Sequence, residues 1–177
     1  MLSLVLDVET TGLDPMRDRI VEVGFVLTDW KSEASELRSY VNPGYAFANE
    51  YNGLSTQDVK DAPSFAQLAP FVYLLLLQAD EYIGHNIGFD NRFFREELAR
   101  LGLPFPTRAQ YDTCSACGRK KLHDACDLYG VKTDDLRFHT ALDDAIASYR
   151  LAFAIRGAPG GRSQGVSEPL TLGPRFR

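Results

Sequence analysis

The chain has 177 residues, 45% of them hydrophobic, which suits one globular domain with a sizeable core. Its 19 Lys and Arg residues stand against 24 Asp and Glu residues, so a formal charge of −5 excludes an overall field that attracts nucleic acid, and any polyanion contact must be local. The longest apolar run, 71–77, is too short to span a membrane, and the N-terminus shows no basic leader. Three cysteines, an odd number, argue against a disulfide framework. We therefore expect a cytoplasmic protein without a membrane segment.

The first half of the chain predicts three strands followed by two helices. Residues 2–7, 20–28 and 37–41 read as strands, and the turn-forming stretches TTGLDP and DWKSEAS separate them. We therefore expect an antiparallel meander. After a loop rich in Gly, Asn and Tyr, Ser55 is expected to cap one helix and Ser64 a second one, which Pro70 should kink.

The second half of the chain alternates strands with helices. Strands are expected at 82–85 and 110–112, and helices at 89–101, 121–129 and 140–155, each followed within two residues by a glycine. A meander followed by this alternation predicts an α/β fold, in which helices flank a mixed sheet of three antiparallel strands and further parallel strands. From residue 158 the chain is rich in Gly, Pro and Ser, so we expect one domain over 1–157 and a flexible C-terminal tail over 158–177.

Four carboxylates are expected on the interior side of their elements. Asp7 and Glu9 stand two residues apart in an extended segment and therefore share a face. Asp90 opens a helix on the face that carries its phenylalanines, and Asp144 has small or apolar neighbours one helical turn away. Inward carboxylates are costly unless they are paired, protonated or bound to cations. A set of oxygen donors without Cys or several His describes a Mg²⁺ or Mn²⁺ site rather than zinc, and two such ions form the clamp used for in-line displacement at phosphorus.

Three motifs resemble those of a known family. DVETTGL at 7–13, GHNIGFD at 84–90 and HTALDDA at 139–145 resemble, in order, spacing and identity, the exonuclease motifs of the DnaQ-like family, in its DEDDh branch. The resemblance covers about residues 1–156. It implies a ribonuclease H-like fold that binds two divalent cations, Mg²⁺ or Mn²⁺. It also implies five catalytic residues, a general base and four metal-binding acids: His139, Asp7, Glu9, Asp90 and Asp144.

The same resemblance implies contacts to a substrate. The terminal nucleotide is expected against Thr10, Thr11, Gly12 and Leu13, and the phosphate near His85 and Asn86. The implied function is metal-dependent 3′→5′ hydrolysis of single-stranded nucleic acid from its 3′ end, with DNA favoured, release of nucleoside 5′-monophosphates, and proofreading or end trimming as its purpose. Exoribonuclease or oligoribonuclease activity is the alternative, and a non-catalytic binding or scaffold role is the alternative from another class. The tail's own sequence, with the apolar residues of EPLTLGPRF at 168–176, is expected to be either a disordered end or a docking segment for a polymerase or another protein.

Two segments depart from the family pattern. Tyr51 and Asn52 stand where an apolar residue and His are usual in a stretch that resembles I-H-G-I-T, which puts the substrate contacts there in question. The interval between residues 113 and 122 is shorter than in most relatives, so we expect that edge of the site to be open. The basic run RKK at 119–121 is expected to be a solvated turn or to help hold an incoming strand.

Local patterns offer two structural alternatives. Cys114, Cys117, His123 and Cys126 have the form C-x2-C-x5-H-x2-C of a four-ligand zinc site, but Cys126 also falls on the apolar face of a helix, where cysteine is a small core residue. Thr140 and Asp143 have the spacing of a capping box, which would give Asp143 an ordinary structural role.

Overall fold

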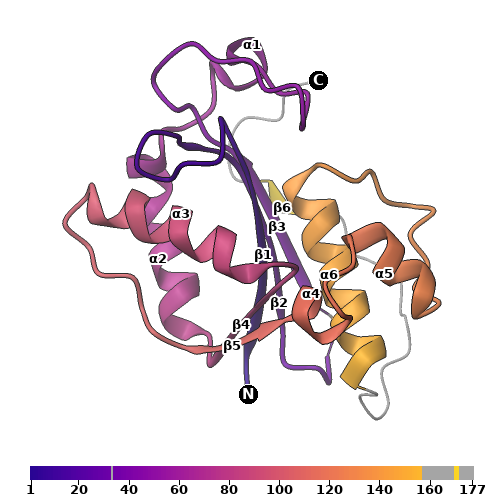
Figure 1. Cartoon of the computed structure of the whole chain (residues 1–177). Coiled ribbons are helices and arrows are strands. Elements are labelled where there is room, and N and C mark those ends of the chain that lie inside the picture. Colours follow the sequence, from indigo (N-terminus) through magenta and orange to yellow (C-terminus); the bar gives the residue numbers. More distant parts are fainter. Residues whose placement is uncertain (33, 157–169, 172–177) are drawn as a thin grey trace.

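A mixed sheet forms the centre of the computed structural model, which describes residues 1–32, 34–156 and 170–171 (Figure 1). Strands β1 (Ser3–Thr10), β2 (Ile20–Thr28) and β3 (Ser35–Tyr40) make an antiparallel meander. Strands β4 (Glu81–Gly84) and β5 (Ala109–Asp112) extend it in parallel beyond β1. The strand order is β5-β4-β1-β2-β3-β6, where β6 is Leu170–Thr171. The predicted α/β fold with a mixed sheet is confirmed.

Helices cover both faces of the sheet (Figure 1). The longer elements α2 (Phe65–Gln78) and α3 (Ile87–Ala99) lie on one face, and α6 (Ala141–Arg156) lies on the other. Three short helices complete the fold: α1 (Thr56–Val59), α4 (Thr113–Ala116) and α5 (Leu122–Leu128). No helix within the described ranges combines the length and the apolar character that a membrane crossing requires.

The alternation of β1 divides the core between these two layers. Leu4, Leu6 and Val8 pack with α2 and α3, whereas Val5 packs in a second cluster with Leu142 and other residues of α6. Both faces of this strand are therefore buried, as expected for the inner strand of a sheet covered on both sides. Residues two apart in a strand point to the same face, so Asp7 and Glu9 face the α6 side, as Val5 does.

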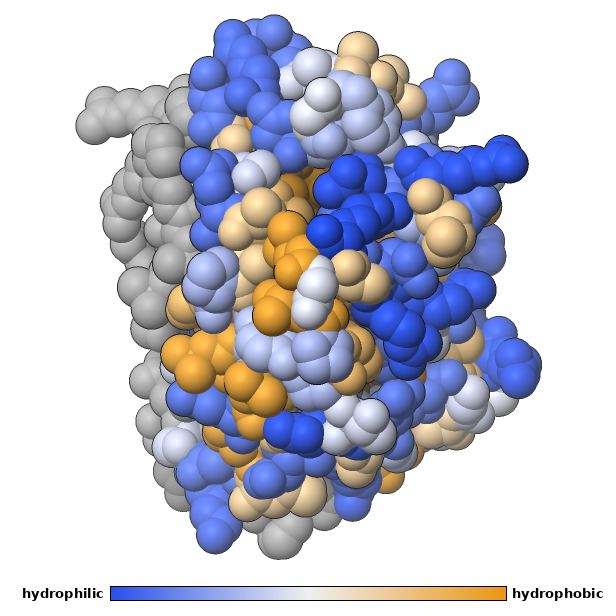
Figure 2. All heavy atoms as spheres, turned by 90° about the vertical axis from the view of Figure 1, so that its left-hand side faces the viewer, coloured by the Kyte–Doolittle hydropathy of each residue, from blue (hydrophilic) through white to orange (hydrophobic). Residues whose placement is uncertain are grey.

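Helix α2 shows how local sequence sets an element and its exposed face. The Ser64 hydroxyl accepts a hydrogen bond from the amide of Gln67, and the Oε1 of Gln67 accepts one from the Ser64 amide, as in a capping box. The helix continues through Pro70 to Gln78. Its outer side leaves Leu74 and Leu77 half exposed, and apolar surface gathers on this face of the molecule (Figure 2).

Three local expectations differ from the structure. Strand β1 runs to Thr10 rather than ending at Asp7, because pairing with β2 continues to Ile20. The predicted capping box of α6 is wrong: the Thr140 hydroxyl donates to the carbonyl of Arg137, and Asp143 accepts from the Arg137 amide instead. The short interval after β5 holds the single-turn helix α4, which had not been predicted.

Gly24 allows α6 to begin close to the sheet. A Cβ at this position of β2 would lie 2.2 Å from the carbonyl carbon and oxygen of Ala141, the first residue of α6. Only a residue without a side chain leaves this space for a helix backbone. The close approach brings the first turn of α6, which carries Asp144, against β1 and β2.

Candidate active site

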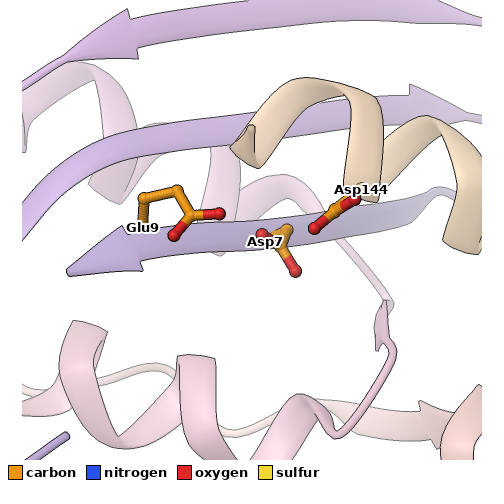
Figure 3. A group of neighbouring side chains, drawn as sticks. All are labelled: Asp7, Glu9 and Asp144. Atoms are coloured by element: carbon orange, nitrogen blue, oxygen red, sulfur yellow. The ribbon is translucent and has the colours of Figure 1, made fainter. Parts of the chain in front are cut away.

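Three carboxylates from two elements meet on the α6 side of the sheet. Asp7 and Glu9 extend from β1, and Asp144 extends toward them from the first turn of α6 (Figure 3). Each offers an oxygen, and these oxygens all lie within 4.8 Å of one another. Such a set of hard oxygen donors matches the preference of Mg²⁺ or Mn²⁺.

The electrostatics of the cluster disfavour its charged state when no cation is bound. Burial and the neighbouring carboxylates of Asp90, Asp144, Glu9 and Glu22 raise the pKa of Asp7 well above its ordinary value. Burial, followed by the charge of Glu9, raises the pKa of Asp144 to about 7. Asp144 Oδ1 is also buried, and it has no hydrogen-bond partner among the residues that the structure describes. An unpaired oxygen among repelling acids is a position where a cation would replace repulsion by attraction.

His139 lies two residues before the start of α6. Its backbone lies in the left-handed region, with φ 67°, and its amide donates to Asp144 Oδ2 at 3.2 Å. The side chain is exposed, and its charge lowers the pKa of Glu9 against the raising effect of burial. The structure therefore brings His139 to the edge of the carboxylate cluster, where its backbone is held and, among the described residues, no hydrogen bond or ion pair holds its ring.

Asp90 lies beside the cluster rather than within the close triad. It is 3% exposed, and its Oδ1 accepts from the amide of Val8, the residue between Asp7 and Glu9, at 3.1 Å. Burial raises the pKa of Asp90 well above its ordinary value, the amide of Val8 opposes this, and the charge of Glu9 adds to it. A role for Asp90 as a fourth metal ligand stays a prediction.

Glu22 is an acid near the site that the sequence reasoning missed. It lies directly across from Glu9 in the β1–β2 register and is 1% exposed. Its carboxylate pairs with Arg38 Nε of β3 at 2.6 Å and accepts from the amide of Ala141 at 3.2 Å. Burial raises the pKa of Glu22, and Arg38 opposes the shift. A lone acid inside the apolar strand IVEVGFVLT was the available signal.

A pocket of about 450 Å³ opens next to the triad, at the end of β1. Its lining includes four residues that sequence reasoning had assigned to the terminal nucleotide: Thr10, Thr11, Gly12 and Leu13. Opposite them stands the segment 48–52, and Phe89 of α3 contributes an aromatic ring. Leu13 is 75% exposed and Tyr51 is 86% exposed, so two large side chains stand free at the rim.

Asn52 ties this segment to the carboxylate cluster. Its Nδ2 donates to Glu9 Oε2 at 2.9 Å and to the carbonyl of Thr10 at 3.2 Å, and its Oδ1 accepts from the amide of Leu54. Asn49 donates to the same Thr10 carbonyl at 2.7 Å. Burial raises the pKa of Glu9, and the hydrogen bond from Asn52, the residue that replaces the family's usual His, opposes this rise.

His85 and Asn86 lie at the end of β4, before α3. His85 Nε2 donates to the carbonyl of Lys120 at 2.8 Å, and Nδ1 pairs with the hydroxyl of Thr113 at 2.9 Å. A phosphate contact by this ring would require one of these bonds to open. Asn86 has an exposed side chain and a left-handed backbone with φ 71°, and its amide donates to Asp112 Oδ1. The Asn86 side chain makes no capping hydrogen bond to the first turn of α3, so such a bond does not compete with the predicted contact to phosphate.

The cysteine pattern does not assemble into a zinc site. Within the described ranges the one cluster with metal-binding spacing is the acidic triad. Cys117 and Cys126 are buried in a core cluster with α6, and His123 lies 3.4 Å from Asp127 on its own helix. Burial raises the pKa of Cys126 to about 11, which disfavours the thiolate that zinc requires.

Comparison with known proteins gives one family over most of the chain. The model of the RNase T family, described as exonuclease, matches residues 4–152. The 3′-5′ exonuclease DinG of Bacillus subtilis is 33% identical over 114 residues, which are 62% of this chain and 12% of DinG. The DNA polymerase III subunit epsilon of Rickettsia felis is 34% identical over 158 residues, covering 81% of this chain and 69% of the subunit.

Solved structures agree on the fold. Exonuclease I of E. coli, in a complex with a dA16 oligonucleotide, superimposes with a TM-score of 0.73 at 18% identity, over 89% of this chain and 41% of exonuclease I. Several curated relatives are much longer than this chain, which spans 11% of a PolC-type DNA polymerase III from Caldanaerobacter subterraneus subsp. tengcongensis.

Proposed function

The chain belongs to the DnaQ-like exonuclease family, and from this premise we propose that it removes nucleotides from the 3′ end of single-stranded DNA and releases nucleoside 5′-monophosphates. The observation that carries the proposal is the acidic triad beside a pocket of nucleotide size. The triad offers ligands for cations, and the pocket offers a place for the last nucleotide.

The family requires a divalent metal, and the donor set fits one. We propose that Asp7, Glu9 and Asp144, with Asp90 beside them, hold two ions, Mg²⁺ or Mn²⁺. Bound cations would supply stabilisation of the charge that develops on the phosphoryl and leaving oxygens. The unpartnered Oδ1 of Asp144 and the raised pKa values of the triad are the features that support this assignment.

The chain's own residues would position the substrate and move a proton. Leu13 and Tyr51 at the rim would meet the terminal base, and the backbone of Thr10 to Gly12 would lie along its sugar. The exposed ring of His139 would accept the proton of the attacking water, because a side chain held only through its backbone can turn toward the pocket. Asp144, anchored in α6, would stay in place during this movement.

The experiment compares three single-stranded substrates with equal sequence: free at both ends, blocked at the 3′ end, and blocked at the 5′ end. With Mg²⁺ or Mn²⁺, the free and 5′-blocked DNA should be degraded to nucleoside 5′-monophosphates, and the 3′-blocked DNA should persist. Asp7→Asn serves as the inactive control. Digestion that starts from the 5′ end would contradict the proposed polarity, and faster digestion of matched RNA would contradict the proposed sugar preference.

We also propose a cellular setting. Three free cysteines, one of them only partly buried, suit the reducing cytoplasm. Similarity to polymerase III subunits supports a polymerase as the partner. The tail over 158–177 stays the proposed docking segment; apart from Leu170–Thr171, which pairs with β3, it lies outside the described residues.

A further inference from the structure

The turn between α4 and α5 carries three consecutive exposed cations, Arg119, Lys120 and Lys121. Throughout the part of the chain that the structure describes, no ion pair joins any of them to an acid. In a protein with a formal charge of −5, such a group is a local exception. Unpaired cations in a row are suited to a partner with repeated negative charges.

The backbone of this turn is held in a defined shape. Gly118 and Arg119 have left-handed backbones, with φ 75° and 62°, and the Arg119 amide donates to the carbonyl of Cys114 at 2.7 Å. The carbonyl of Lys120 accepts from His85 Nε2 at 2.8 Å. A carbonyl can only accept, so this ring nitrogen carries the hydrogen. His85 thus fastens the cationic turn to the end of β4.

The attachment point lies next to the acids. Strands β1 and β4 are parallel, and Val5 pairs with Ile83. Asp7 lies two residues after Val5 and His85 lies two residues after Ile83, so the two residues stand at the same level of neighbouring chains. A Cβ on Gly84 would lie 3.0 Å from the carbonyl of Leu6, which shows how closely the two chains run there. The turn is therefore displaced from the acids by one strand in the direction of β4.

The nucleotide pocket lies on the opposite flank of the acids. Most of its wall comes from 10–13, which lead toward β2, and from 48–52, which follow β3, and Phe89 of α3 contributes to the lining. Because the strand order is β5-β4-β1-β2-β3, the acids of β1 stand between the pocket and the turn. A strand whose last nucleotide fills the pocket and whose last phosphodiester lies at the acids would continue toward the cations.

We propose that residues 119–121 form a second contact site for single-stranded nucleic acid, which binds phosphates on the 5′ side of the cleaved bond. The inference rests on the proposed function for its direction along the strand. The proposal predicts that affinity depends on substrate length, because a strand long enough to reach the turn gains charge-assisted contacts that the shortest substrate lacks. The His85 bond to the Lys120 carbonyl and the Arg119 bond to the Cys114 carbonyl hold the backbone of the turn, which lowers the entropy cost of ordering it on binding.

Binding can be measured without turnover, as the anisotropy of a 5′-labelled DNA decamer in Ca²⁺ at several salt concentrations. Lys120→Ala should reduce the slope of log affinity against log salt by about 0.7, the value of one single-strand phosphate contact. Lys31→Ala is the matched control, because Lys31 is an exposed cation in the β2–β3 turn at the opposite end of the sheet. An unchanged slope in Lys120→Ala, or an equal change in Lys31→Ala, overturns the proposal.

Kinetics separate this site from the catalytic one. The ratio of kcat/KM for the decamer to that for the 4-nitrophenyl ester of thymidine 5′-monophosphate should fall roughly fivefold in Lys120→Ala and stay constant in Lys31→Ala. An equal loss on both substrates would make the turn a structural element. If the parent protein cleaves neither substrate, the proposed function fails, while the salt slope still decides whether the turn binds nucleic acid. An acidic protein segment as the true partner would leave the DNA slope unchanged and refute the site.

Discussion

Replacing Asp144 by Asn should stabilise the metal-free protein at neutral and alkaline pH. The pKa of Asp144 is raised from 3.8 to about 7, with burial as the first cause and Glu9 as the second. A raised pKa of an acid means that the folded state disfavours the charged form, so ionisation costs stability as pH rises from the unfolded pKa to the folded one. The penalty is absent below both values and complete above the folded value.

The magnitude follows from the shift. A difference of about 3 pKa units corresponds to about 4 kcal/mol of unfolding free energy near pH 8, and to about 0.6 kcal/mol near pH 4. The amide cannot ionise, so it removes this penalty. It also keeps a group that can accept from the His139 amide, as Asp144 Oδ2 does at 3.2 Å, and its NH₂ can donate to the carboxylate of Asp7. The new amide therefore has partners for both of its ends.

Urea unfolding in EDTA provides the measurement. The free energy of unfolding of Asp144→Asn minus that of the parent should grow from about 0.6 kcal/mol at about pH 4 to about 4 kcal/mol at about pH 8. Asp143→Asn is the comparison variant, because Asp143 is the neighbouring acid of the same helical turn outside the triad; its charge raises the Asp144 pKa less than burial or Glu9 does, so its gain in stability should be much smaller. A variant less stable than the parent at alkaline pH would show that the charge of Asp144 supports the fold, and would refute the reasoning about the cluster.

Three further outcomes test the site. Mn²⁺ should raise the melting temperature of the parent and leave that of Asp7→Asn nearly unchanged; equal shifts would place the ion elsewhere. At a free Mn²⁺ concentration of one hundred times its Kd, the gain in unfolding free energy is about 2.7 kcal/mol. His139→Ala should lower the single-turnover rate roughly 10²- to 10⁴-fold with oligonucleotide affinity in Ca²⁺ unaltered, and near-normal turnover would remove His139 from the mechanism. Gly24→Ala should cost about 1–3 kcal/mol and most of the activity, because its Cβ would overlap the first residue of α6; a melt like the parent's would show that α6 can shift without loss.

The sequence by itself determined the family, the α/β class and the strands and helices with strong periodicity. The family and the nuclease class are confirmed over residues 4–152, and the meander and parallel strands stand as predicted. Asp7 and Glu9 were found because strand parity is a local property: two residues apart means one face. Asp144 was found for a similar reason, as an acid among small neighbours on a helix. The structure brings these three acids together, and the roles predicted for them stay predictions.

Contacts between distant segments were decided only by the tertiary structure. Glu22 meets the start of α6, 119 residues away, because strand register and the missing side chain at Gly24 allow the approach. Asn52 reaches Glu9 across 43 residues, and His85 reaches Lys120 across 35. Each bond depends on where a loop or helix packs, which the local pattern around either partner does not encode. Periodicity and capping reflect the few residues around a position, whereas these hydrogen bonds depend on the packing of the whole sheet and its helices.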